Sequence, residues 1–256
     1  MTNPVFFADA ASIADLEPGD DFELAGDEGH HAATVKRIAV DEHLDIVDGV
    51  GLRLNCIVLQ TAPGTLTVRV QSRLAEPAPQ PRLVLVQALA KDGRDELAIE
   101  TATELGVDAV IPWQADRSIV RWRPERVEKS MAKWAKTIQA ATKQARRART
   151  PLLLDPVDSP GLVKRIALLP KSRMLVLHEE ATTDLLQLVD QYKDVEELLL
   201  VVGPEGGMSD RELELFSSAG SEKLRLGPHV LRSSTAGPAA VVLLSEALGR
   251  WRVTLS

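Results

Sequence analysis

The chain has 256 residues and a net charge of −7, with 45% hydrophobic and 26% charged residues, which is typical of a soluble globular protein of one large or two modest domains. A single cysteine, Cys56, excludes an internal disulfide framework and a cysteine-rich metal site. No apolar run approaches the roughly 20 residues that span a bilayer, and the N-terminus lacks a signal-peptide pattern, so we expect a cytoplasmic protein without a membrane segment.

Residues 1–74 have the pattern of a small β-rich domain. Short alternating segments such as HLDIVDGVG, RLNCIVLQ and TLTVRVQSRL lie between glycine and proline turns. A short helix is expected at GDEGHHAATVKRI. The neighbouring His30 and His31 would not face each other on a helix, so capping or a surface contact is favoured over a metal site. Three prolines in LAEPAPQPRL then predict a linker at 75–82.

Residues 83–256 alternate between predicted strands and helices, which indicates an α/β domain with a largely parallel sheet. The run RLVLVQALA suits a strand covered on both faces. A helix ending at Gly106 and the strand DAVIPW follow it. A long helix is expected from Pro124 to Arg149, with proline in its first turn. The segments RMLVLHE, ELLLVVGPEGG and KLRLG are the remaining strands.

The long helix is amphipathic and basic. Residues 117–149 carry eleven Lys or Arg against two acids, whereas residues 1–35 carry eight acids and no Lys or Arg. This asymmetry indicates a local basic face that could bind nucleic acid, although a solvated helix surface explains the same pattern. The candidate RNA-binding residues are Lys36, Arg37, Arg121, Arg123, Lys133, Lys136, Lys143 and Arg147.

A glycine-rich loop, GPEGG at 203–207, follows the strand ELLLVV and precedes a helix. Ser209 and Glu212 have the spacing of a capping box at the start of that helix. Ligands of open α/β sheets bind beyond the carboxyl ends of strands, where this loop lies. The spacing fits neither a P-loop nor a dinucleotide fingerprint, and Glu205 would repel a phosphate. A ligand with positive charge or hydrogen-bond donors fits better; the alternative is a tight turn without a ligand.

A second loop leaves the last strand through Gly227-Pro228 and enters another helix. Pro238 is placed like a first-turn proline, with Thr235 or Gly237 as possible caps. The helix that follows, Ala239–Leu248, is apolar on more than one face. We therefore expect it to be buried, in part against a second subunit.

The pair GPEGG and LGPHVLRSSTA resembles the SPOUT superfamily of RNA methyltransferases, and more narrowly the ribosomal RNA small subunit methyltransferase E family. HHAATVKRIAVDEHLDIVDGVG, LAKDGRDELAIETATELGVDAVIPWQADRSIVRW and AATKQARRARTP are similar to further segments of that family. One departure is Ser234, where the family usually has Glu.

The resemblance implies a PUA-like β-barrel over 1–74 and a SPOUT domain with a trefoil knot over 83–256, which forms a homodimer. It also implies a methyltransferase that uses S-adenosylmethionine to methylate N3 of a uridine in small-subunit rRNA or the assembled small subunit. Because the sulfonium methyl is already electrophilic, we expect no metal. Another RNA target such as tRNA, or a catalytically silent RNA-binding protein, stays open.

The site residues follow from the matched motifs. Uridine N3 carries a proton and is a poor nucleophile until that proton is lost, and a cation beside the base oxygens would stabilise the anionic base. Arg232 and Arg117 are the candidates, and each could instead bind phosphate or pair with an acid. His178 is either a ligand contact or an ordinary strand-end histidine. The expected cofactor-binding residues are His178, Gly203, Pro204, Glu205, Gly206, Gly207, Leu226, Gly227, Leu231, Ser234, Thr235 and Ala236.

Overall fold

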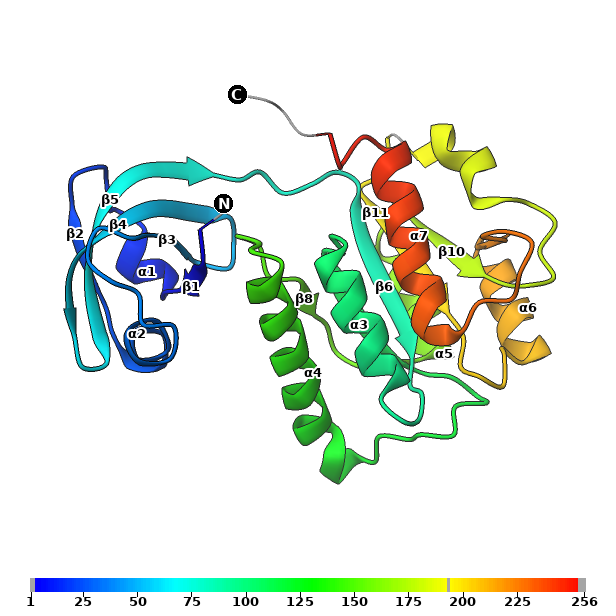
Figure 1. Ribbon diagram of the computed structural model, residues 1–256. Coiled ribbons are helices and arrows are strands. Elements are labelled where there is room, and N and C mark those ends of the chain that lie inside the picture. The colour runs from blue at the N-terminus through cyan, green and yellow to red at the C-terminus, as the bar shows by residue number, and fades with distance from the viewer. Residues whose placement is uncertain (1–2, 193, 253–256) are drawn as a thin grey trace. The chain divides into compact units, whose positions relative to one another are not determined.

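A computed structural model describes residues 3–192 and 194–252 (Figure 1). The chain divides into two compact units. The first comprises residues up to Ala78 together with Thr142–Thr150, and the second comprises Pro79–Ala141 and the chain from Pro151. The second unit is therefore interrupted at 142–150, whereas the sequence pattern led us to expect a continuous domain over 83–256.

The first unit is a β-rich fold, as the alternating pattern predicts. Its sheet has the order β1-β3-β4-β5-β2, with β1 parallel to β3 and the other pairs antiparallel. All five strands contribute to one core, which includes Phe6, Leu24 and Leu44. The elements are β1 (Val5–Phe7), α1 (Ala10–Ile13), β2 (Asp21–Leu24), α2 (Gly26–His30), the π-helical η1 (His31–Val35), β3 (His43–Val47), β4 (Leu52–Ala62) and β5 (Thr65–Ala75).

Charged side chains fasten residues 142–150 to the first unit. Lys143 Nζ lies 2.7 Å from Glu28 Oε2 and 5.0 Å from the centre of the Phe6 ring. Arg149 Nη2 donates to the carbonyl oxygen of Glu76 at 2.6 Å. Apolar periodicity cannot reveal these contacts, because charged side chains make them.

The second unit is an α/β fold with a parallel sheet of order β12-β10-β11-β6-β7-β8, and β9 also pairs with β7. This confirms the fold class. The elements are β6 (Arg82–Ala88), α3 (Arg94–Glu104), β7 (Ala109–Gln114), α4 (Pro124–Gln144), β8 (Leu152–Leu153), β9 (Val157–Asp158), α5 (Ser159–Ala167), β10 (Ser172–Leu177), the 3₁₀ helix η2 (Leu185–Tyr192), β11 (Glu197–Val202), α6 (Asp210–Ser218), β12 (Glu222–Leu224) and α7 (Ser233–Ala247).

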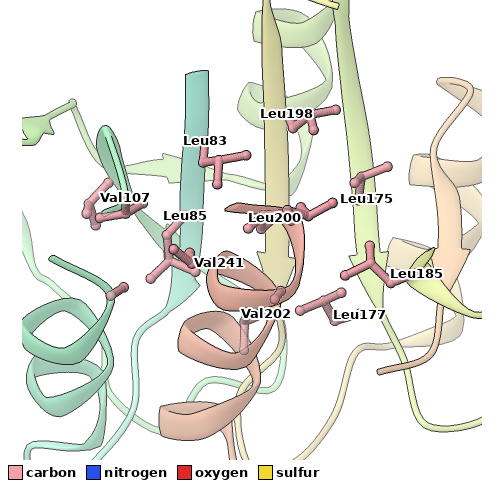
Figure 2. Close-up of a cluster of buried hydrophobic side chains, with 14 of the residues drawn as sticks. Leu83, Leu85, Val107, Leu175, Leu177, Leu185, Leu198, Leu200, Val202 and Val241 are labelled. Carbon is pink, nitrogen blue, oxygen red and sulfur yellow. The ribbon is translucent and has the colours of Figure 1, made fainter. Parts of the chain in front are cut away.

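Both faces of this sheet are covered, which explains the continuous apolar runs of β6 and β11. Leu83 and Leu85 of β6 pack with Val241 of α7 on one face (Figure 2). Val84 of the same strand points to the opposite face, where Phe216 of α6 lies. Helices α3 and α7 lie side by side over the first face (Figure 1). Strand pairing does not describe threading, so the trefoil knot stays a prediction.

Two helix boundaries differ from the predicted ones. The basic helix α4 ends at Gln144, not Arg149, because Arg146 adopts a left-handed φ of 55° that a continuing helix does not allow. Helix α7 begins at Ser233, so Pro238 lies inside it rather than in its first turn, and the predicted caps Thr235 and Gly237 are helical residues. Gly237 has a packing reason: a Cβ there would lie 2.6 Å from Leu85 Cδ1.

Among the described residues, no helix is long and apolar enough to cross a membrane.

Candidate functional site

A cavity of about 300 Å³ lies where β10 and β11 end, at the carboxyl edge of the parallel sheet. Four segments surround it: the start of α3, the turn after β10, the glycine loop after β11 and the residues that lead into α7. Its lining residues are Arg94, Leu177, His178, Glu179, Val202, Gly203, Pro204, Glu205, Gly207, Met208, Val230, Leu231, Arg232, Ser233 and Ala236. The sequence pattern predicted this location and part of this set.

The glycine loop is a tight turn closed by a hydrogen bond from Gly207 N to the carbonyl oxygen of Pro204 at 2.9 Å. Gly207 has a φ of 70°, a left-handed conformation that favours glycine. A Cβ at Gly203 would lie only 3.2 Å from Met208 Cγ. The left-handed conformation of Gly207 and the close packing at Gly203 therefore determine the geometry of the loop.

A buried carboxylate fixes the exit of this loop. Ser209 caps α6 and Glu212 completes the capping box, as the spacing predicted. The Glu212 side chain is fully buried, and its Oε1 also accepts from Asp116 N at 2.8 Å and from Ser159 Oγ at 2.7 Å. One carboxylate thus joins α6, α5 and the segment after β7.

The Asp116 carboxylate also connects the segment after β7 with the start of α6. Arg211 Nη2 donates to Asp116 Oδ1 at 2.6 Å, and Ser209 Oγ donates to Asp116 Oδ2 at 2.7 Å. The hydrogen bond from Arg211 lowers the pKa of the Asp116 carboxyl below its ordinary value. The start of α6 is therefore attached to the 115–118 segment at two points.

Arg117 contacts the glycine loop and does not line the cavity. Its Nη1 donates to the carbonyl oxygen of Gly206 at 3.3 Å. Gly206 faces Arg117: a Cβ on Gly206 would lie 3.4 Å from the Arg117 Cβ. The geometry therefore favours a role for Arg117 in holding the glycine loop, rather than the predicted contact with the base oxygens. Gly206 does not line the cavity.

Arg94 is a lining residue that the sequence patterns did not single out. It is the first residue of α3, and its Nη1 lies 3.5 Å from Glu205 Oε1. The acid that was expected to favour a positively charged ligand therefore already has a cationic neighbour. The pairing depends on α3 and the glycine loop meeting at one sheet edge, so no local pattern could reveal it.

His178 lies directly after β10 and lines the cavity. Its Nδ1 accepts a hydrogen bond from Glu180 N at 3.2 Å, so the proton of the neutral ring is on Nε2. The ring is therefore arranged to donate a hydrogen bond from Nε2 rather than to accept a proton there.

Leu231 and Arg232, which lead into α7, and Ser233 and Ala236 of α7 itself line the cavity. The buried Ser233 hydroxyl has no hydrogen-bond partner among the described residues, which leaves a donor and acceptor for a ligand. Ser234 is buried and Thr235 is exposed, but neither lines the cavity.

Leu226 and Gly227 line a neighbouring hollow of about 650 Å³ with residues of η2, including Leu186. A smaller hollow of about 60 Å³ contains Leu226 together with His178 and Leu231 of the main cavity. The predicted cofactor-binding residues therefore cluster around adjoining hollows, with Gly206, Ser234 and Thr235 outside their lining.

The basic residues are not equally available to RNA. Lys143 is paired with Glu28 and Lys133 with Glu96. Lys136 and Arg123 are exposed, and the exposed Arg121 donates to the carbonyl oxygen of Asp116 at 3.3 Å. Lys36 and Arg37 are exposed in the first unit, and Arg147 is half-buried. The charge pattern of a helix does not show which of its lysines form ion pairs with acids elsewhere in the chain.

Across residues 3–192 and 194–252, no group of three or more His, Cys, Asp or Glu side chains is arranged to hold a metal ion.

Comparison with known proteins relates both units to RNA methyltransferases. Residues 76–245 match the RNA methyltransferase domain family and residues 24–71 match the RNA methyltransferase PUA domain. The ribosomal RNA small subunit methyltransferase E of Mycobacterium tuberculosis is 42% identical over 233 residues, which are 90% of this chain and 88% of the relative. The enzyme of the same name from Bacillus subtilis is 27% identical, over 86% of this chain and 88% of the relative.

A solved structure supports the same assignment. A Legionella pneumophila protein, described as a methyltransferase in complex with the bound cofactor SAM, superposes with a TM-score of 0.80 at 29% identity, over 96% of this chain and 98% of that chain. Together with the family match over most of the second unit, these relatives confirm the resemblance of the sequence motifs: the chain belongs to the ribosomal RNA small subunit methyltransferase E family.

Proposed function

We propose that this protein transfers a methyl group from S-adenosylmethionine to N3 of a uridine in small-subunit ribosomal RNA. The observation that carries the proposal is the cavity at the carboxyl ends of β10 and β11, in a chain of this family. The names of the relatives supply the RNA class, and the Legionella structure supplies a bound SAM.

The cavity residues fit such a cofactor. Glu205 and Glu179 are acids suited to its positive charge, and the orphan Ser233 hydroxyl suits a polar group. A volume of about 300 Å³ lies at the lower end of the usual range for small-molecule sites. The apolar part of the lining, which suits a purine ring, consists of Leu177, Val202, Met208, Leu231 and Ala236.

The proposed reaction sets the tasks of the polar residues. In the transfer a bond forms between N3 and the methyl carbon, the sulfonium–methyl bond breaks with its electron pair staying on sulfur, and the N3 proton leaves to solvent. Arg232 lines the cavity and would stabilise the negative charge that the base oxygens gain. His178 would donate from Nε2 to a ligand oxygen.

The direct test is reconstitution. Purified protein, labelled S-adenosylmethionine and small ribosomal subunits or their naked RNA are combined, and the RNA is digested to nucleosides. We expect label in 3-methyluridine. Label in a different nucleoside or only in added tRNA would assign another target, and cofactor binding without any transfer would favour a catalytically silent RNA-binding protein.

We also propose that the second unit forms a homodimer and that the protein acts in the cytoplasm, where its RNA substrate would be found. Val230 is 77% exposed and Leu186 is 50% exposed beside the adjoining hollows, and a second subunit would cover such apolar side chains. Sedimentation at low concentration should give a dimer; a stable, active monomer would contradict the first part.

A further inference from the structure

The short segment before α3 fixes Arg94 at the edge of the cavity. Asp92 and Gly93 both have left-handed φ values, 58° and 71°, so the chain turns back sharply after β6. The neighbouring Asp95 is buried, and its carboxylate accepts from Ala90 N at 3.3 Å and from Glu96 N at 2.9 Å. Arg94 is therefore carried by an anchored first helical turn.

The ion pair between Arg94 and Glu205 is a loose one. The 3.5 Å between Nη1 and Oε1 exceeds the 2.7–2.9 Å that is usual for a charge-assisted hydrogen bond. By contrast, Arg211 and Asp116 approach to 2.6 Å. The Arg94 and Glu205 side chains are 34% and 20% exposed, and both residues line the cavity. A weak pair inside a ligand cavity can be opened at little cost.

We propose that this pair exchanges partners during the reaction and that Arg94 is a substrate-contacting cation. Glu205 would leave Arg94 for the positive charge of the cofactor, and the freed guanidinium would hydrogen-bond an oxygen of the uracil ring. That oxygen gains negative charge when N3 loses its proton, so a cation beside it favours the reactive form. This inference rests on the proposed function.

Neither Arg117 nor Arg232 already occupies the position that we propose for Arg94 beside the uracil oxygen. Arg117 is engaged with Gly206 and does not line the cavity. Arg232 does line it, but from the start of α7, whereas Arg94 comes from α3. A uracil ring has two oxygens beside N3, so one arginine at the start of α3 and another directly before α7 can serve one base.

The first test measures cofactor binding without RNA. Calorimetry compares the wild type with Glu205→Gln, with Arg94→Gln and with Lys164→Gln, an exposed control on α5. Glu205→Gln should weaken S-adenosylmethionine binding by at least about tenfold. Arg94→Gln should leave it unchanged or tighten it by about threefold, because the competitor of the ligand is removed. If Arg94→Gln weakens binding as much as Glu205→Gln does, the exchange is wrong.

The second test measures turnover against pH. Arg94→Gln should lower kcat by about 100-fold. It should also move the rising limb of the kcat profile to higher pH, because without the cation the pKa of uridine N3 in the complex rises. Arg94→Lys should restore part of the shift. An unchanged kcat, or a lower kcat with the limb in place, would overturn the role of Arg94.

The outcomes separate this inference from the proposed function. If the wild type forms 3-methyluridine and Arg94→Gln has the same turnover as Lys164→Gln, only the role inferred for Arg94 is contradicted. A wild type that binds S-adenosylmethionine but methylates another position contradicts the proposed function, and the calorimetry still decides the exchange. A wild type that binds no S-adenosylmethionine contradicts both. Melting temperatures of all variants identify any that fail to fold.

Discussion

Two adjacent residues of the glycine loop, Gly206 and Gly207, should respond differently to the addition of a side chain. Gly207 has a φ of 70°, which costs an alanine about 1–2 kcal/mol. Gly206 has no such φ, and a Cβ there would make an ordinary 3.4 Å contact with Arg117. Gly207→Ala should therefore weaken S-adenosylmethionine binding by up to about tenfold, and Gly206→Ala should not. Calorimetry on both variants checks this; equal losses would contradict the assignment.

Several residues that the sequence motifs indicated line one cavity, and their tasks stay predictions. GPEGG and the segment before α7 mark the cavity, because glycine loops and strand ends leave a local pattern. Arg94 could not be found in this way, since its partner Glu205 is more than a hundred positions away. Arg117 was expected at the base oxygens, but a hydrogen bond to Gly206 gives it a position outside the cavity lining.

At the scale of elements, packing and helix propensity predict opposite effects on stability for the substitution of Gly237 in α7. Alanine is the better helix former by about 1 kcal/mol, so propensity alone predicts that Gly237→Ala stabilises the protein. The added Cβ would lie 2.6 Å from Leu85 Cδ1 in a closely packed core, and overpacking of this kind costs about 1–3 kcal/mol. We expect a net loss in denaturant unfolding. Thr235→Ala, on the exposed side of α7, should show no comparable loss.

The start of α6 should be sensitive to acid. Because Arg211 lowers the pKa of Asp116 in the folded protein, the carboxylate contributes stability above its ordinary pKa of about 3.9 and loses it as the pH falls further. Asp116→Asn should therefore lower the melting temperature at pH 7 and have a smaller effect near pH 3. If the difference in melting temperature between Asp116→Asn and the wild type is the same at both pH values, the ion pair of Asp116 with Arg211 does not contribute to stability.

Element boundaries were predicted where local signals mark them. Pro124 does begin α4, and the Ser209–Glu212 capping box does begin α6. The beginning of α7 was missed because Pro238 resembles a first-turn proline, whereas the helix begins five residues earlier, at Ser233. The early end of α4 depends on the left-handed Arg146, a residue type that does not signal such a turn.

At the scale of the whole molecule, the order of the predicted segments indicated a β-rich part followed by an α/β part, and the structure has both. That pattern did not show that residues 142–150 return to the first unit, where Lys143 and Arg149 make charged contacts and Ala148 packs with Val5 and Val47. The contact of Lys143 also changes the interpretation of the basic helix, because this lysine is already paired with Glu28 of its own chain.

RNA binding should therefore depend on the basic residues that remain available. Lys129 and Lys136 of α4 are exposed and have no ion-pair partner among the described residues. Replacing both with Gln should weaken RNA binding and reduce the slope of log affinity against log salt by about 0.7–0.9 for each phosphate that the protein no longer neutralises. Lys133→Gln, which removes a paired lysine, is the matched control. An unchanged slope in the double variant would place RNA binding elsewhere, for example at Lys36 and Arg37.

The central claim is that this chain methylates N3 of a uridine in small-subunit rRNA. Nucleoside analysis of that RNA from a strain without the protein tests it most directly. We predict that 3-methyluridine disappears from the small-subunit RNA and returns when the wild-type chain is supplied, but not when Glu205→Gln is supplied. If the strain keeps its full content of 3-methyluridine in small-subunit RNA, the claim is wrong.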